Sequence, residues 1–141
     1  MRHGPVCSSA SPRHLHHVGI VLPSEERATD LMYLLGLHES HRGFVEPYQA
    51  TCIFTQGNGG SPIEFVVPAG GALARFNRGA GGLHHVAVAV DSIADVQRSF
   101  AERGQKLLEA QAVRGAGNFL CNFLPPAYTR GVIVEFIEEL E

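Results

Sequence analysis

Two histidine doublets are the residues of this sequence whose type and spacing point most directly to chemistry. His16-His17 and His84-His85 each open an apolar run, and the second doublet follows the first by about half the chain. Neutral imidazole is the commonest metal ligand in proteins, and it also exchanges protons near neutral pH. A pattern that recurs at such a distance indicates an internal repeat. The doublets therefore predict two related halves that contribute histidine to one functional site.

Each half also carries one acid inside an apolar strand candidate. Glu64 lies in the run Ile63–Val67, and Glu135 lies in the run Val132–Ile137. A carboxylate in such a strand is costly to bury without a partner. The two acids are therefore expected to meet positive charge, and the histidines of the doublet strands are the candidates that the repeat offers.

Strand alternation predicts on which side these four residues lie, because successive side chains of a strand point to opposite faces. The bulky residues that alternate with His17 and His85 should lie under a helix: Val18, Ile20, Leu22, Val86, Val88 and Val90. By the same parity, Glu64 and Glu135 point away from the face that a helix covers. If pairing of the halves curls the sheet around that side, all four residues meet at one cation.

Two imidazoles and two carboxylates suit a divalent ion, and the two negative charges offset its charge. The set predicts one ion per chain without deciding among Zn, Ni, Co, Mn and Fe(II). The alternative is that each histidine is a hydrogen-bonded structural residue and each glutamate a rim acid. His16 and His84 are one step out of phase with the predicted ligands, so we expect them to point toward the helix side and to be structural.

Two segments have the features of helices that could cover the sheet. Ser24–Leu35 and Ser92–Arg103 begin at serines, which are good N-caps, and Gly36 and Gly104 follow their ends. Their apolar residues recur at helical spacing, which gives each segment one apolar face. Each doublet strand is thus followed by a helix.

Weaker strand candidates fill the space between each helix and its closing strand. They are Gln49–Thr55 in the first half, and Gln105–Glu109 and Asn118–Leu124 in the second. The prediction is an α+β domain over residues 14–141, with one module at 14–69, a glycine-rich connector at 70–82 and a second module at 83–141. Residues 1–13 are expected to form a flexible tail.

The composition of the 141-residue chain excludes several classes of protein. Hydrophobic residues make up 45% and charged residues 18%, which fits neither a disordered nor a fibrous chain. The formal net charge of -3 argues against a nucleic-acid surface built on bulk positive charge. No apolar run approaches the roughly 20 residues that span a bilayer. We therefore expect neither a nucleic acid nor a membrane as partner.

The three cysteines do not form a recognisable framework. Cys7, Cys52 and Cys121 are odd in number and contain no CxxC pair, so neither a disulfide scaffold nor a cysteine zinc site is predicted. A reducing, cytoplasmic location is the expectation. Cys52 and Cys121 lie in strand candidates, where a small buried residue is a better interpretation than a nucleophile.

From about Leu15 to Glu138 the chain resembles the vicinal oxygen chelate superfamily, which includes glyoxalase I, extradiol dioxygenases and methylmalonyl-CoA epimerases. Among these it looks most like the epimerases. The segments that carry the resemblance are His17–Val21, Ile63–Pro68, Leu73–Phe76, Gly82–Ala87, Phe123–Leu124 and Thr129–Glu135. Where the epimerases commonly have a His-Pro-x-Ser stretch, this chain has Pro125–Tyr128.

The resemblance implies a fold of two βαβββ modules whose strands form a cupped, eight-stranded mixed sheet around a metal ion, often in a homodimer. It implies that His17, Glu64, His85 and Glu135 are the ligands. In the epimerases a further glutamate acts as an acid/base, and Glu46 falls where it is expected. Glu135 is the second candidate acid/base.

The function implied is that of a metal-dependent epimerase acting on a 2-substituted malonyl-type acyl thioester. A divalent ion would stabilise the enolate, and groups on both faces of the carbon would exchange its proton. A glyoxalase I-like lyase acting on a glutathione hemithioacetal is the first alternative. A non-catalytic small-molecule-binding protein of the same superfamily is the second.

Overall fold

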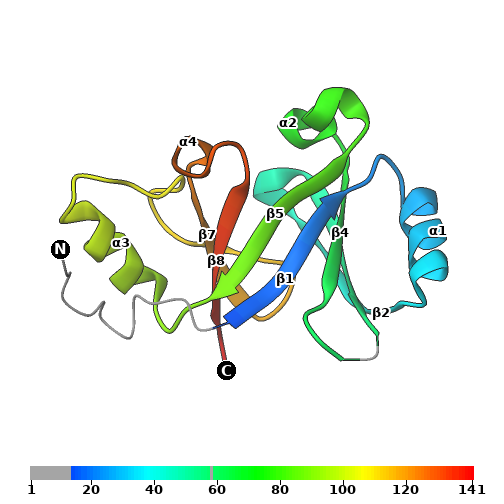
Figure 1. The fold of residues 1–141 in the computed structure, drawn as a ribbon, viewed down its shortest axis with the longest axis horizontal. Helices are drawn as coiled ribbons and strands as arrows, with labels where there is room; N and C mark the ends of the chain where they lie inside the picture. Colours follow the sequence, from blue (N-terminus) through cyan, green and yellow to red (C-terminus); the bar gives the residue numbers. More distant parts are fainter. Residues whose placement is uncertain (1–13, 58) are drawn as a thin grey trace.

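A computed structural model describes residues 14–57 and 59–141 of the chain. Eight strands form one mixed sheet in the order β2-β3-β4-β1-β5-β8-β7-β6 (Figure 1). The strands are β1 (His14–Val21), β2 (His38–Val45), β3 (Ala50–Gln56), β4 (Ile63–Pro68), β5 (Gly82–Ala89), β6 (Val113–Arg114), β7 (Phe119–Leu124) and β8 (Ile133–Glu139). The helical elements are α1 (Glu25–Leu35), η1 (Glu46–Tyr48), α2 (Gly71–Ala74), η2 (Phe76–Gly79), α3 (Ile93–Ala101) and α4 (Pro126–Thr129). The expected flexible tail, residues 1–13, lies outside the described residues.

The two halves of the sheet repeat one topology. β1 pairs in parallel with β4, β5 pairs in parallel with β8, and the antiparallel pair β1·β5 joins the halves at the centre. Each half runs strand, helix and three strands, so the predicted α+β fold of two βαβββ modules is confirmed. The duplication therefore places the two doublet strands next to each other.

The predicted capping residues begin both long helices. Ser24 Oγ accepts a hydrogen bond from the N–H of Arg27 at 3.2 Å, and Ser92 Oγ accepts one from the N–H of Asp95 at 3.1 Å. These bonds satisfy N–H groups that have no partner within the helix. Gly36 ends α1 in the left-handed conformation, with φ 68°. The second helix is shorter than predicted, since α3 ends at Ala101.

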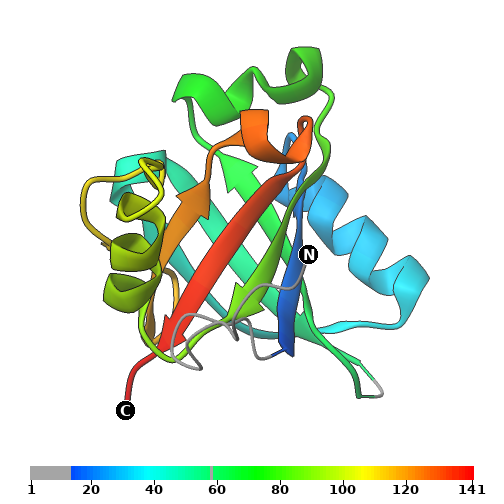
Figure 2. The same ribbon diagram turned by 60° about the vertical axis from the view of Figure 1, so that its left-hand side comes forward.

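The two long helices lie on opposite flanks of the sheet (Figure 2). Beneath α1, Ala28 packs with the buried Ile53 and Phe65. Beneath α3, Val96 packs with Phe136. Burying a side chain of this size contributes roughly 1.5–3 kcal/mol. The bulky faces predicted from alternation are therefore the faces that the helices cover, which leaves the other face of the sheet for the predicted site.

The predicted strand at Gln105–Glu109 is wrong, because the backbone of this segment does not form the regular hydrogen bonds of a strand pair. Leu108 N–H donates to the carbonyl of Phe123 at 2.8 Å, and the Asn122 side chain bonds to both backbone groups of Glu109 at 3.0 Å. The short strand β6 takes the place of the predicted one in the sheet.

Strand β2 was not predicted. Its sequence is largely polar and exposed, and it pairs only with β3 at the edge of the sheet, so it lacks the apolar alternation that marks a half-buried strand. His38 and His41 lie in this strand, and both are exposed. No helix in the described part of the chain is long and apolar enough to cross a membrane.

The concave side of the sheet is partly closed by contacts between the halves. The Tyr48 hydroxyl, in the turn between β2 and β3, donates a hydrogen bond to Glu109 Oε2 in the second half at 3.0 Å. Tyr48 also packs edge-on against Phe123 of β7, with ring centroids 5.6 Å apart. These contacts bring the first half against the second across the space enclosed by the sheet.

Candidate metal centre

The four predicted ligands converge on the concave side of the four central strands. His17 comes from β1, Glu64 from β4, His85 from β5 and Glu135 from β8, and all four side chains are buried. One ligand atom from each lies within 4.8 Å of the others. The Nε2 atoms of the two histidines are 3.2 Å apart, and each lies 3.0–3.2 Å from Oε1 of both glutamates. Donor atoms at this spacing suit bonds of about 2.0–2.1 Å to one ion.

The two buried carboxylates of the cluster need positive charge nearby. Burial by itself lowers the pKa of a histidine, because it disfavours the charged form. At His85 the carboxylates of Glu135 and Glu64 outweigh burial and raise the pKa to about 10. Burial has the opposite effect on a carboxyl group and would raise the pKa of Glu64, but the two imidazoles outweigh it and hold that pKa below its usual range. Protons on the imidazoles can balance the carboxylates, and a divalent ion that displaces those protons would do the same.

One oxygen of the cluster supports the fit of an ion. Glu135 Oε1 is fully buried and accepts no hydrogen bond from the described residues, although both Nε2 atoms lie close to it. A buried carboxylate oxygen without a donor is costly. A cation between the four side chains would satisfy it. The donor set of two imidazoles and two carboxylates therefore fits a divalent metal ion.

The first histidine of each doublet, His16 or His84, lies in a β-bulge. In the pairing of β1 with β5, Leu15 and His17 lie opposite two consecutive residues of β5, so His16 is the extra residue in β1. His84 is the extra residue in β5 by the same criterion. A bulge interrupts the alternation of side chains. The expectation that His16 and His84 point toward the helix side is therefore wrong.

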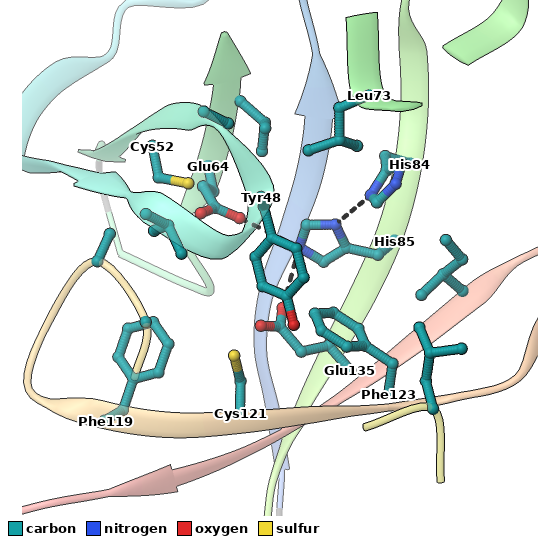
Figure 3. Close-up of a pocket in the computed structure, with 17 residues that line it drawn as sticks. Tyr48, Cys52, Glu64, Leu73, His84, His85, Phe119, Cys121, Phe123 and Glu135 are labelled. Atoms are coloured by element: carbon teal, nitrogen blue, oxygen red, sulfur yellow. Dashed lines mark hydrogen bonds and ion pairs between the residues drawn. The ribbon is translucent and has the colours of Figure 1, made fainter. Parts of the chain in front are cut away.

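Each bulged histidine contacts the outer nitrogen of the predicted ligand that follows it. The Nδ1 atoms of His16 and His17 are 2.8 Å apart, and those of His84 and His85 are also 2.8 Å apart. The second pair is drawn in Figure 3. Outer partners of this kind orient metal-binding histidines and select their tautomer.

A cavity of about 200 Å³ adjoins the cluster. Its wall is largely apolar, as Figure 3 shows, and it includes Leu73, Phe119 and Phe123. No lysine or arginine among the described residues lines it. Such a wall excludes water and strengthens electrostatic interactions inside.

Two thiols also line the cavity, one from each half. Cys52 and Cys121 are buried and free, as predicted, and burial raises the pKa of both well above the usual range. The nearby carboxylates of Glu64 and Glu135 add to the effect of burial on both pKa values. Both thiols therefore stay protonated, which argues against a role as nucleophiles.

The structure does not bring Glu46 into this group. Its side chain is exposed in η1 and does not line the cavity. Tyr48, two residues later in the same turn, lines the cavity instead. Sequence reasoning did not identify Tyr48, because no periodic pattern marks the direction of a side chain in a single turn. The acid/base role of Glu46 stays a prediction.

Comparisons with known proteins agree with this fold. The family model of the Glyoxalase/Bleomycin resistance protein/Dioxygenase superfamily matches residues 16–123. A search of curated protein sequences finds no match. A methylmalonyl-CoA epimerase from Mycobacterium tuberculosis superposes with a TM-score of 0.86 at 22% identity, covering 97% of this chain and 94% of the other.

Two further solved structures are similar. A hypothetical protein from Bacillus halodurans has a TM-score of 0.79 at 30% identity, covering 90% of this chain and 94% of its own. A Streptomyces coelicolor methylmalonyl-CoA epimerase variant in complex with 2-nitronate-propionyl-CoA has a TM-score of 0.83 at 18% identity, covering 93% of this chain and 100% of its own. The family match spans most of the chain, and the chain therefore belongs to the Glyoxalase/Bleomycin resistance protein/Dioxygenase superfamily.

Proposed function

We propose that this protein is a metal-dependent epimerase that moves a proton at the acidic carbon of a 2-substituted malonyl-type acyl thioester. The observation that carries the proposal is the buried cluster of His17, Glu64, His85 and Glu135, which borders an apolar cavity. Neighbouring structures of methylmalonyl-CoA epimerases support the substrate class, and one of them holds an acyl-CoA analogue. One divalent ion per chain, such as Co, Mn, Ni or Zn, is part of the proposal.

The residues of this chain have separate roles in such a reaction. His17, Glu64, His85 and Glu135 would hold the ion, which supplies Lewis-acid stabilisation of the enolate's negative charge. Glu135 is also the proposed acid/base on one face of the carbon, because its side chain lines the cavity next to the cluster. The apolar wall of the cavity would keep water from the carbanion. Glu46 is the proposed group for the opposite face.

A glyoxalase-type isomerisation is the second candidate, and the charge of the cavity favours it. Glu64 and Glu135 already neutralise a divalent ion, and no lysine or arginine of the described chain lines the cavity. A malonyl carboxylate would add an unpaired negative charge in an apolar site, which is costly. A glutathione hemithioacetal is neutral at its reacting end and avoids that cost.

Proton exchange separates the two candidates. The protein is loaded with each of Zn, Ni, Co and Mn and incubated in deuterated water with methylmalonyl-CoA, and deuterium at C2 is followed by NMR. Metal-dependent exchange that is lost in His85→Ala supports the epimerase. Absence of exchange, together with turnover of the hemithioacetal of glutathione and an α-keto aldehyde, supports the second candidate. Inactivity on both substrates with every metal rules out both enzymes and favours the binding protein.

The assembly and the location of the protein are also proposals. The homodimer follows from the family resemblance, and the cytoplasmic location follows from the cysteine content. Sedimentation velocity on the metal-loaded protein tests the homodimer, since a monomer at all concentrations would contradict it.

A further inference from the structure

The two histidine doublets have the same inner contacts but different outer ones. In both, Nδ1 of the bulged histidine lies 2.8 Å from Nδ1 of the ligand histidine. Nε2 of His16 then lies 3.4 Å from Glu139 Oε2, so the first doublet ends on a carboxylate. Nε2 of His84 has no hydrogen-bond partner in the part of the chain that the structure describes.

Metal binding determines where the protons of both doublets lie. A histidine that binds a metal through Nε2 must carry its proton on Nδ1. The Nδ1–H of His85 is then the donor in its contact with His84, so Nδ1 of His84 must be the acceptor. A neutral imidazole has one donor and one acceptor nitrogen. The proton of His84 is therefore on Nε2.

His84 lines the cavity, whereas His16 does not. Figure 3 shows His84 next to His85 at the cavity wall, below Leu73. The His84 ring packs edge-on against Phe76, with centroids 5.0 Å apart, and this contact restrains its orientation. In a wall that is otherwise largely apolar, an oriented N–H group is a specific recognition element.

We propose that His84, held in its Nε2–H tautomer by His85, donates a hydrogen bond to an oxygen atom of the bound substrate. This inference deepens the proposed function and rests on it. The acceptor would be an oxygen at the reacting end of the substrate, either the thioester carbonyl or the carboxylate. The hydrogen bond from His84 would strengthen as negative charge develops on that oxygen, as in other preorganised sites for oxyanions.

The tautomer can be measured without any substrate. Long-range proton–nitrogen correlation NMR on the zinc-loaded, nitrogen-15-labelled protein reports which ring nitrogen carries the proton, and the signals lost in His84→Asn identify His84. The expected result is a proton on Nε2 of His84 and on Nδ1 of His85. A proton on Nδ1 of His84 would overturn the proposal.

Two substitutions at His84 separate the donor from the acceptor. In His84→Asn the amide oxygen can still accept from His85, but the Nε2–H donor is lost. We expect zinc affinity within about threefold of the parent and methylmalonyl-CoA affinity, measured calorimetrically, reduced roughly tenfold, as for one hydrogen bond. In His84→Gln the amide reaches toward the Nε2 position instead, so zinc affinity should fall roughly 10- to 100-fold as an outer partner is lost. At saturating zinc, this variant should bind methylmalonyl-CoA more tightly than His84→Asn.

The exposed His38 provides the matched control, and His38→Asn should change neither affinity. Unchanged methylmalonyl-CoA affinity in His84→Asn would contradict the proposal. If the parent protein binds neither methylmalonyl-CoA nor the glutathione hemithioacetal, the proposed function fails. The role of His84 toward substrate fails with it, whereas a proton on Nδ1 of His84 in a protein that binds substrate overturns the role of His84 alone.

Discussion

Gly19 and His85 face each other across the central strand pair β1·β5. A Cβ atom added at Gly19 would collide with Cε1 and both nitrogen atoms of the His85 imidazole. The lack of a side chain at Gly19 is therefore what allows His85 to turn toward His17. At the equivalent place across from His17 the sheet has Ala87, which is fully buried.

Gly19→Ala should consequently impair the metal centre. The imidazole of His85 must move, and a displaced ligand lowers affinity, so we expect zinc to bind at least tenfold more weakly. Competition with a chromophoric chelator measures this. Gly70→Ala is the control, because Gly70 has an extended φ of 169° and open space where its Cβ would lie. Equal zinc affinity in the two variants would show that His85 tolerates the methyl group.

The protein should hold about one divalent ion per chain through its four buried ligands. His85→Ala removes a ligand, and we expect elemental analysis after dialysis to show almost no bound metal in this variant. His38→Ala removes an exposed histidine from β2 and should keep the parent stoichiometry. Metal content that is unchanged in His85→Ala would refute the ligand set.

The turn before β3 contains two candidates for the second acid/base group. Glu46→Gln should leave the metal bound and slow deuterium exchange into methylmalonyl-CoA if the predicted role is correct. Tyr48→Phe removes a hydroxyl that lines the cavity and bonds to Glu109, and it should slow exchange roughly tenfold or more if that hydroxyl contacts the substrate. Exchange at the parent rate in Glu46→Gln would remove Glu46 from the mechanism.

The stability of the metal-free protein should depend on pH through the cluster. The pKa of His85 is raised from 6.5 to about 10, so its contribution to folding is fully present below pH 6.5 and is lost as the pH rises through 10. The pKa of Glu64 lies below its ordinary 4.5, so its contribution is present above pH 4.5 and is lost as the pH falls. Urea unfolding after chelator treatment should therefore show less stability at pH 10 than at pH 6. A smaller decrease is expected in His85→Ala.

Asn122 should be important for stability although it does not line the cavity. It is fully buried, its Oδ1 accepts from the N–H groups of Glu109 and Phe123, and its Nδ2 donates to the carbonyl of Glu109. Asn122→Ala leaves these groups unsatisfied, and we expect the free energy of unfolding to fall by about 2 kcal/mol or more. The exposed Asn118→Ala is the comparison in urea unfolding, and an equal effect of the two would contradict this account.

The convergence of His17, Glu64, His85 and Glu135 could be predicted from the sequence because it depends only on repetition and on strand alternation. His17 and Glu64 occupy the same positions in one half as His85 and Glu135 in the other. In each strand, parity separates them from the apolar face. These patterns are local, because the side chains of each strand alternate between its two faces whatever lies beside it. The duplication then indicates which strands of the two halves correspond.

The roles of the neighbouring residues were decided only by the tertiary structure. Whether His84 follows the alternation depends on the bulge in β5, and that bulge exists only in the pairing with β1. Which residue of η1 enters the cavity depends on how the turn ends, and Gln49 ends it in the left-handed conformation, with φ 52°. Bulges and turns are set by the partner strand and by packing from the other half of the chain. A local pattern therefore identifies the four residues that converge, while the residues that surround them follow from contacts between segments far apart in sequence.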